Sequence, residues 1–291
     1  MGEGVNHAAM PPTTIAASLY AAKTRLKPES DSASLDAQAL LAWTLGADRA
    51  YLLAHGDAAL TDEQAARFAA LVARRAAGEP VAYILGRRAF YDREFIVTPA
   101  VLIPRPETEL LLERALAFVR GRAHTVAVDV GTGSGALAVT LAALCPGAQV
   151  HAVDISPAAL EVARRNAALH AAPVTFHQGD LLGPLRAAGV QVDLLLANLP
   201  YIASGELPAL AVSRFEPALA LDGGADGLAL VRRLLAQAPA LLRPGALALL
   251  EIGAGQGAAA LALARAALHP ADAGVLPDYA GLDRVVWAGV G

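Results

Sequence analysis

The sequence predicts an α/β fold with a mostly parallel sheet, preceded by a small bundle of helices. From residue 125 onward, short strand-like apolar segments alternate with longer helical segments, which is typical of parallel strands joined by crossover helices on both faces of a sheet. Between residues 13 and 79, apolar residues recur at helical spacing instead. This second pattern indicates a separate all-helical domain.

The chain divides into four predicted segments: a flexible N-terminus at 1–12, a helical domain at 13–79, a β-hairpin linker at 80–103 and the larger domain at 104–291. In the linker, the β-branched and aromatic residues at 81–85 and 90–97 are expected to form strands. Asp92 and Arg93 are expected to form the turn.

In the larger domain, each element is predicted from its local pattern of apolar residues. The expected strands are 125–130, 150–153, 174–177, 192–197 and 246–252, with a final pair around Val275 and 284–290. The expected helices are 136–144, 157–170, 228–242 and 258–268, with another beginning near Glu107.

The composition argues against several classes of protein. Among 291 residues, 23 Lys and Arg face 27 Asp and Glu, for a net charge of −4, so no global basic field is available to hold a nucleic-acid backbone. The one cysteine, Cys145, rules out an internal disulfide framework and a cysteine-rich zinc site, and no metal is expected. Arg232 and Arg243 interrupt the longest apolar runs, so no membrane span is expected. The first 14 residues lack a secretory signal pattern, and we expect a cytoplasmic protein.

A glycine-rich turn follows the strand at 125–130. Its residues are Gly131, Thr132, Gly133, Ser134 and Gly135. Glycine allows a positive φ and lets the backbone approach a ligand closely, and the next helix begins with unpaired N–H groups. Ligands of open α/β sheets bind at the carboxyl ends of the strands. We therefore predict that these five residues bind a cofactor.

Three aspartates lie at strand ends near this turn. Asp154 follows the strand at 150–153, 23 residues after Gly131, where a carboxylate accepts hydrogen bonds from both hydroxyls of an adenosine ribose. Asp129 precedes the turn, and it either caps backbone N–H groups there or faces a cationic part of the cofactor. Asp180 either accepts a hydrogen bond from the adenine amino group or caps a short helix, and its neighbour Leu181 is expected to cover the adenine ring.

Two kinds of nucleoside cofactor fit the turn. The spacing Gly131-x-Gly133-x-x-Ala136 satisfies the dinucleotide fingerprint, in which Ala replaces the third Gly. Asp129 favours S-adenosylmethionine instead, because a carboxylate at this place opposes a pyrophosphate but attracts cationic amino and sulfonium groups. We therefore expect S-adenosylmethionine as cofactor and S-adenosylhomocysteine as product.

A tetrapeptide follows the strand at 192–197, at the same expected edge of the sheet: Asn198-Leu199-Pro200-Tyr201. Asn198 and the Leu199 carbonyl supply acceptors, Pro200 stiffens the turn and Tyr201 offers a flat face. A planar amino nitrogen is a poor nucleophile because its lone pair is delocalised. Two acceptors that hold its hydrogens would orient it toward a methyl donor. We assign these four residues to catalysis and substrate binding, with Asn198 also beside the cofactor; the alternative is a plain strand-ending turn.

These residues resemble the HemK-type family of peptide chain release factor glutamine N5-methyltransferases. The resemblance covers nearly the whole chain, and it includes Pro104-Arg105-Pro106-Glu107-Thr108-Glu109, residues 129–135, Asp154, the tetrapeptide, Arg214-Phe215-Glu216-Pro217 and Ala220-Leu221-Asp222-Gly223-Gly224. It implies a Rossmann-like class I S-adenosylmethionine-dependent methyltransferase with a seven-stranded sheet. It also implies that the helical domain helps to recognise the substrate.

The resemblance further implies an activity. Enzymes of this family methylate the side-chain amide nitrogen of the glutamine in the Gly-Gly-Gln loop of bacterial-type release factors. By the resemblance, Asn198 and the Leu199 carbonyl hold that amide. The family has proline directly after the asparagine, so Leu199 departs from the pattern and the loop loses one φ restraint. This departure concerns the rate rather than the type of reaction.

Three other interpretations stay open. A ribosomal-protein glutamine methyltransferase uses the same chemistry, and an adenine N6 DNA methyltransferase uses a similar tetrapeptide on a similar amino group. The net charge and the non-basic N-terminal domain argue against the DNA enzyme and against stable nucleic-acid binding. The third interpretation is a non-catalytic nucleotide-binding module.

Overall fold

The computed structural model describes residues 13–291, so the flexible segment expected at 1–12 lies outside the described residues. The chain separates into two compact units, the first ending at Gly86 and the second beginning at Arg87. Within residues 13–291, none of the helices combines the length and hydrophobicity needed to cross a bilayer.

The first unit is helical, in agreement with the periodicity of its sequence. Its helices are α1 (Ile15–Leu26), α2 (Ala33–Leu45), α3 (Arg49–Ala54), α4 (Asp62–Ala76) and α5 (Val81–Leu85). Thr61 and Gln64 form a capping box that satisfies backbone N–H groups at the start of α4. Leu40, Leu41 and Phe68 belong to the core on which the helices pack.

The prediction of a strand at 81–85 is wrong, because these residues form the short helix α5. Ile84 joins the core of the first unit, and Gly86 ends the helix with a φ of 72°. A short apolar run has no periodicity that separates a strand from a buried helical turn. The hairpin itself is present but lies later and is shorter, with β1 (Arg87–Phe90) antiparallel to β2 (Arg93–Ile96). Its turn consists of Tyr91 and Asp92.

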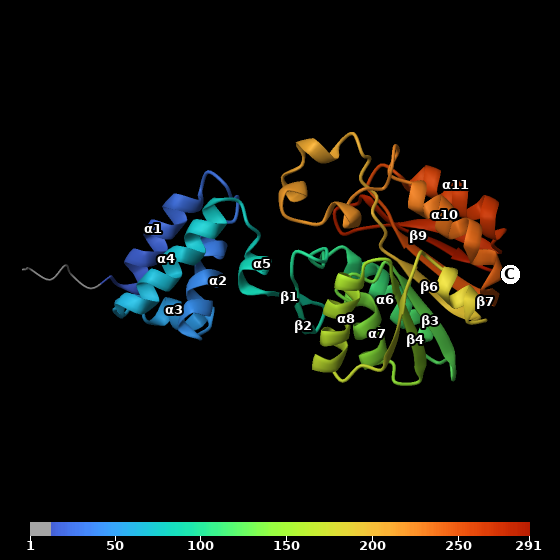
Figure 1. Cartoon of the computed structure of the whole chain (residues 1–291), viewed down its shortest axis with the longest axis horizontal. Helices are drawn as coiled ribbons and strands as arrows, with labels where there is room; N and C mark the ends of the chain where they lie inside the picture. Colours follow the sequence, from blue (N-terminus) through green and yellow to red (C-terminus); the bar gives the residue numbers. More distant parts are fainter. Residues whose placement is uncertain (1–12) are drawn as a thin grey trace, which may run out of the picture. The chain divides into compact units, whose positions relative to one another are not determined.

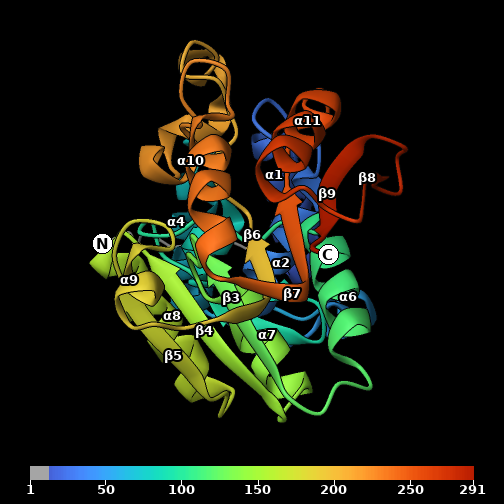
Figure 2. The same ribbon diagram turned by 90° about the vertical axis from the view of Figure 1, so that its right-hand side faces the viewer.

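The second unit is built on a seven-stranded sheet in the order β5-β4-β3-β6-β7-β9-β8 (Figures 1 and 2). Its strands are β3 (Thr125–Val130), β4 (Ala148–Asp154), β5 (Val174–Gln178), β6 (Val192–Ala197), β7 (Leu242–Glu251), β8 (Asp272–Pro277) and β9 (Asp283–Gly289). Strands β3 to β7 are parallel, and β9 lies antiparallel between β7 and β8. The expected mostly parallel sheet and its final strand pair are confirmed.

Six α-helices cover this sheet: α6 (Thr108–Val119), α7 (Ala136–Leu144), α8 (Pro157–Leu169), α9 (Gly183–Ala187), α10 (Ala229–Gln237) and α11 (Gly257–Leu268). Helix α10 ends five residues before the predicted end at 242. Ala238 precedes Pro239, which disfavours a continuing α-helix, and residues Ala238–Ala240 form a 3-10 turn instead.

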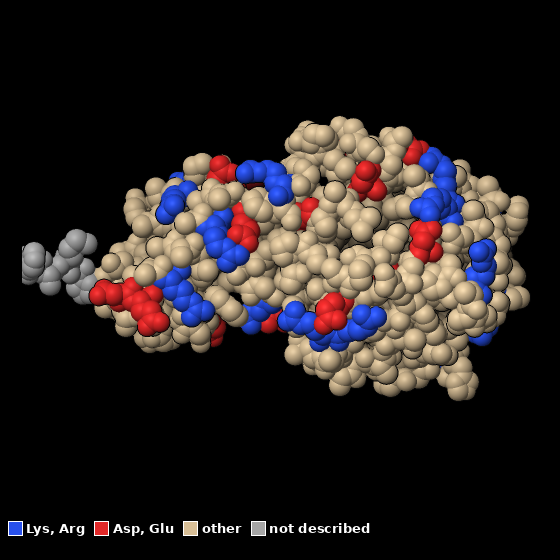
Figure 3. Space-filling view, in the orientation of Figure 1, with Lys and Arg blue, Asp and Glu red and all other residues tan. Residues whose placement is uncertain are grey.

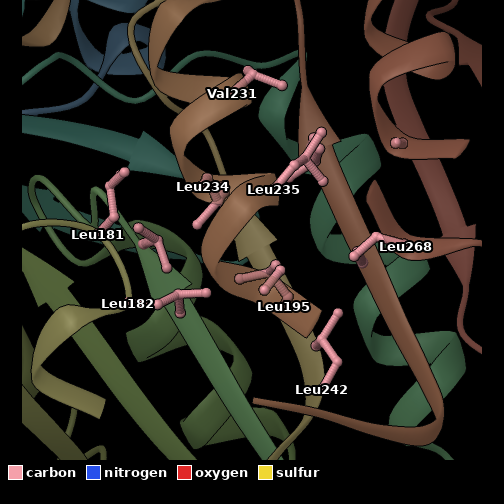
Figure 4. Packing of buried hydrophobic residues seen from close by; sticks show 14 of the residues in the cluster. Leu181, Leu182, Leu195, Val231, Leu234, Leu235, Leu242 and Leu268 are labelled. Atoms are coloured by element: carbon pink, nitrogen blue, oxygen red, sulfur yellow. The ribbon is translucent and has the colours of Figure 1, made fainter. Parts of the chain in front are cut away.

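The alternation of side chains along each strand places the core on both faces of the sheet. On β6, Leu194 and Leu196 pack with α6 and α7, whereas Leu195 packs on the opposite face with α10 and α11. Figure 4 shows Leu195 beneath Leu234 and Leu235 of α10. Burying each of these side chains contributes roughly 1.5–3 kcal/mol, so the rigid centre of the unit lies directly under the polar strand ends.

A buried asparagine links the hairpin to the glycine turn. Asn166 of α8 is fully buried. Its Oδ1 accepts from Ile96 N at 2.7 Å, and its Nδ2 donates to Ile96 O at 2.9 Å and to Ser134 O at 2.8 Å. It therefore serves as a bridge between β2 and the turn of residues 131–135.

Replacing this asparagine should destabilise the second unit. Asn166→Leu leaves three backbone groups without partners, so we expect the free energy of unfolding to fall by about 2–4 kcal/mol. Urea denaturation followed by circular dichroism measures the change. Arg165→Ala, at an exposed position of the same helix, should stay within about 0.5 kcal/mol of the wild type. Equal stability of the two variants would contradict the bridging role.

Candidate active site

A cavity of ≈ 280 Å³ lies at the carboxyl ends of β3, β4, β5 and β6. The structure brings most of the predicted site residues together on its lining. These are Asp129, Gly131, Thr132, Gly133, Ser134, Asp154, Asp180, Leu181, Asn198, Leu199 and Pro200. The strands of the second unit thus bring residues from distant parts of the sequence together around one cavity.

Two predicted residues, Gly135 and Tyr201, lie off this lining. A Cβ on Gly135 would meet Val139 and Ala163 at 3.1 and 3.2 Å, so this glycine, with a φ of 82°, allows α7 to pack closely on α8. The Tyr201 ring packs instead near Gly253, where an added Cβ would lie 3.5 Å from Tyr201 Cδ2. Gly135 and Tyr201 therefore pack against neighbouring backbone outside the cavity lining.

The glycine turn lies directly against the tetrapeptide. Gly131 has a φ of 75° and Gly133 a φ of 56°, conformations that disfavour side chains. A Cβ on Gly131 would lie 2.9 Å from Leu199 Cδ2 and 3.8 Å from Asn198 O. Close approach between these two chain segments, as well as the sign of φ, therefore requires glycine here.

Asp154 spans the turn and the start of the next helix. Its Oδ2 accepts from Gly133 N at 2.9 Å, and its Oδ1 accepts from Ser156 N at 2.9 Å. Burial raises the pKa of this carboxyl, and the two backbone N–H groups oppose that rise. The carboxylate thus lines the cavity and also holds the shape of the turn.

Asp129 accepts hydrogen bonds from the turn and from the start of α7, which is the capping role that the sequence analysis offered as one alternative. It is buried, and its Oδ2 accepts from Thr132 Oγ1 at 2.6 Å and from Ala138 N at 3.3 Å. Burial raises its pKa to about 6, and the nearby Asp154 charge adds to the rise. Because Asp129 also lines the cavity, a cation held there would stabilise its ionised form.

Asp180 is not a helix cap. Helix α9 begins at Gly183 after Leu182 and has no side-chain cap. The Asp180 carboxylate instead pairs with Arg233 of α10 at 2.5 Å, and both side chains are about half exposed. Leu181 beside it is buried and has a φ of 49°.

The tetrapeptide presents two acceptors at the cavity. Asn198 Nδ2 donates to Thr108 Oγ1 at 3.0 Å. Within residues 13–291, neither Asn198 Oδ1 nor the Leu199 carbonyl receives a hydrogen bond from the protein. Both acceptors therefore remain unused by the described part of the protein, and the Thr108 contact orients the asparagine.

Leu199 is anchored by packing. Its side chain is 5% exposed and belongs to the core beneath α10, and it contacts Gly131 across the cavity edge. This burial offsets the φ restraint that a proline would give. The Leu199 carbonyl belongs to the main chain and would be present with proline as well.

Two further contacts hold the segment that follows the tetrapeptide. Gln256 Nε2 donates to Tyr201 O at 2.9 Å, and Gln256 Oε1 accepts from Gly253 N at 2.9 Å. A Cβ on Gly223 would lie 2.7 Å from Pro200 O. Backbone from residues 200–201, 223 and 253 therefore packs together behind the cavity.

A partly buried ion pair lies beside the cavity, whose lining includes Arg105. Glu216 is 5% exposed, and it pairs with Arg105 at 2.5 Å and accepts from Ile103 N at 3.0 Å. Three 3-10 turns lie in this loop: η1 (Leu207–Ala209), η2 (Ala211–Arg214) and η3 (Ala218–Ala220). Pro217 and Leu219 of the same loop line the cavity.

Sequence reasoning assigned no role to Thr108, Arg233 and Gln256. For Glu216 it left open whether this residue orients the pocket through Arg214 or caps a turn, whereas the structure pairs it with Arg105. Thr108, Arg105 and Glu216 occur in the strings that carried the family resemblance, which was the available signal. Their partners are 90 to 111 positions away, so no local pattern links the members of each pair.

Comparisons with known proteins decide the family. Residues 18–86 match the family described as PrmC N-terminal domain, and residues 127–222 match the family described as Methyltransferase domain. The chain is 49% identical over 253 residues to a release factor glutamine methyltransferase of Moorella thermoacetica, covering 86% of this chain and 89% of that relative. A release factor glutamine methyltransferase of Geobacter sulfurreducens is 43% identical over 265 residues, covering 90% of this chain and 91% of the relative. The chain belongs to the release factor glutamine methyltransferase family.

Solved structures agree with this assignment at the level of the fold. A methyltransferase from Pyrococcus furiosus has a TM-score of 0.52 at 18% identity, covering 68% of this chain and 88% of that one. The expected fold, a methyltransferase domain with a seven-stranded sheet after a helical N-terminal domain, is therefore confirmed.

The contact between the glycine turn and Leu199 yields a test. Gly131→Ala forces a side chain into a left-handed conformation and displaces Leu199, so we expect the free energy of unfolding to fall by about 1–3 kcal/mol. Chemical denaturation measures the change. Gly205→Ala, a position with open space and no positive φ, is the matched control and should change stability by less than about 0.5 kcal/mol. If Gly131→Ala behaves like the control, the turn and the tetrapeptide are not tightly packed.

Proposed function

We propose that this chain transfers a methyl group from S-adenosylmethionine to the side-chain amide nitrogen, N5, of the glutamine in the Gly-Gly-Gln loop of peptide chain release factors. Family membership supports the substrate class. The observation that carries the chemistry is the pair of acceptors, Asn198 Oδ1 and the Leu199 carbonyl, beside the glycine turn.

The residues around the cavity fit S-adenosylmethionine, which supplies an electrophilic methyl group on a sulfonium when bound. Asp154 offers carboxylate oxygens for the ribose hydroxyls, and Asp129 offers negative charge for the cationic amino and sulfonium groups. Residues Gly131–Gly135 allow the ligand to approach the backbone closely. Asp180 and Leu181 are the candidates for the adenine amino group and ring.

In this proposal the tetrapeptide acts by holding the glutamine amide in a reactive orientation. Asn198 Oδ1 and the Leu199 carbonyl accept the two hydrogens of the glutamine amide, which turns its nitrogen lone pair out of conjugation and toward the methyl carbon. Holding reactants in such a geometry can lower a barrier by about 7–11 kcal/mol. Bound S-adenosylmethionine would supply the methyl group and would leave as S-adenosylhomocysteine, and the amide nitrogen held by Asn198 and Leu199 would lose one proton to water. No strong base is required, because that proton becomes acidic as the new bond forms.

The charge distribution disfavours the DNA methyltransferase alternative. The net charge is −4. On the face that Figure 3 shows, Lys and Arg side chains lie among Asp and Glu side chains, with no continuous basic surface. Binding to a nucleic-acid backbone draws on such a surface, so a protein glutamine is the better substrate. A ribosomal-protein glutamine would undergo the same chemistry and is the second candidate.

The decisive experiment is mass spectrometry of the Gly-Gly-Gln peptide from a purified release factor incubated with S-adenosylmethionine and the enzyme. We expect the glutamine to gain one methyl group. Asn198→Ala should lower turnover about 100-fold or more, because the grip on the amide is lost, while cofactor affinity measured by calorimetry changes little.

Parallel incubations with ribosomal protein and with DNA separate the alternatives. Methylation of either in place of the release factor would replace the proposed substrate. A release factor with the glutamine changed to alanine is the negative control. Full turnover by Asn198→Ala would remove the proposed role of the tetrapeptide.

Asp129 makes cofactor binding depend on pH. Because its pKa is about 6 in the free protein and a cationic ligand favours the ionised carboxylate, S-adenosylmethionine should bind more tightly as the pH rises from about 5 to about 7, then level off. Calorimetry across this range measures the slope. Asp129→Asn should bind more weakly at neutral pH and show a smaller slope; an unchanged slope would exclude Asp129 as its source.

A further inference from the structure

A buried carboxyl beside the tetrapeptide has no part in the chemistry above. Glu251 is the last residue of β7 and is 1% exposed. Because Ala197 of β6 pairs with Leu250 of β7, Glu251 and Asn198 come next to each other at the end of the sheet. Within residues 13–291, Glu251 Oε2 has no hydrogen-bond partner. Burying a carboxyl in this way is costly, so its presence calls for a physical reason.

Thr108 connects this carboxyl to the asparagine. It is 5% exposed and is the first residue of α6. Its Oγ1 accepts from Asn198 Nδ2 at 3.0 Å, and its side chain lies close enough to the Glu251 carboxyl to lower the pKa of that group. A carboxyl, a hydroxyl and a carboxamide therefore follow one another from the end of β7 to the end of β6.

The Thr108 hydroxyl has a single proton, and this fixes which group donates and which accepts along the series from Glu251 to Asn198. An ionised carboxylate only accepts hydrogen bonds, so the Thr108 proton must turn toward Glu251. The Thr108 lone pairs then remain for Asn198, and only the NH₂ side of the carboxamide can face them. The asparagine is thereby held with Oδ1 away from Thr108.

We propose that Glu251 is a positioning residue that acts through Thr108 to make Asn198 present its oxygen, rather than its NH₂ group, to the substrate. The inference rests on the proposed function, since a glutamine amide offers two donors that need an acceptor. A flipped Asn198 would place NH₂ against NH₂, two donors that cannot bond. The buried carboxylate therefore selects one of the two carboxamide orientations.

The surroundings of Glu251 place its ionisation near neutral pH. Burial raises its pKa to about 7, and Glu107 before α6 adds to the rise, whereas the Thr108 side chain, Arg284 of β9 and Arg105 oppose it. Tyr201 also faces this carboxyl, and its own pKa is raised chiefly by burial. A protonated Glu251 no longer fixes the Thr108 proton, so we expect turnover to rise as the pH increases through about 7.

The test compares three variants with the wild type, using release factor and saturating S-adenosylmethionine between about pH 5.5 and pH 8.5. Thr108→Val removes the relay and should lower kcat at least about tenfold, with little change in cofactor affinity. Thr108→Ser keeps the hydroxyl and should retain most of the wild-type kcat. Glu251→Gln should lose the change in kcat through neutral pH. Thr140→Val, which removes another buried hydroxyl on α7, is the matched control and should keep the wild-type kcat.

The outcomes separate this inference from the proposed function. A wild-type enzyme that does not methylate the release factor rejects the function itself. If the wild type is active, wild-type turnover in Thr108→Val or an equal loss in Thr108→Ser overturns the relay. A wild-type pH profile in Glu251→Gln overturns the role of the carboxyl, and this variant decides the matter if Thr108→Val melts before the assay temperature.

Discussion

The site depends on the pairing of two adjacent parallel strands. Strands β3 and β6 are in register with Val130 opposite Ala197, so the residues that follow, Gly131 and Asn198, leave the sheet side by side. One strand leads into the glycine turn and the other into the tetrapeptide. A slip of this register would turn buried side chains toward the wrong face, and the leucines above and below β6 prevent it. The distance between the glycine turn and the tetrapeptide is thus set by backbone hydrogen bonds between the two strands.

Around this pairing, the loops are held by buried polar contacts over long sequence distances. Asn166 ties the hairpin to the turn, Glu216 ties the segment before α6 to the loop after the tetrapeptide, and Gln256 holds Tyr201. Loops are normally the mobile parts of an α/β unit. Here each one meets a side chain whose removal leaves buried backbone groups without partners. The shape of the cavity therefore depends on single residues outside its lining.

The sequence was sufficient for the sheet, the order of its elements and the positions of the glycine turn, Asp154 and Asn198, because each of these follows from a local pattern at a strand end. The helix at 81–85 differs from the expected strand because five apolar residues carry no period, and α10 ends before 242 because Pro239 disfavours a continuing α-helix. Thr108 and Glu251 were not assigned roles for a different reason. Their partners lie far away in the sequence, so no local pattern indicates their roles, although Thr108 belongs to a string that carried the family resemblance.

Carboxyl groups buried at one edge of a sheet have opposing consequences for stability and for function. Burial raises the pKa values of Asp129, Asp154 and Glu251, so their ionised forms are disfavoured in the folded chain. The unfolded chain ionises these groups at lower pH, and the stability they contribute is lost as the pH rises from their ordinary pKa values toward the raised ones. A cation bound in the cavity reverses this loss for the two aspartates, because it favours the same charge that burial penalises. For Glu251, Arg105 and Arg284 of the chain itself oppose the rise, but burial still raises the pKa to about 7. The free protein thus carries two aspartates whose ionised forms burial disfavours and a bound cation would favour.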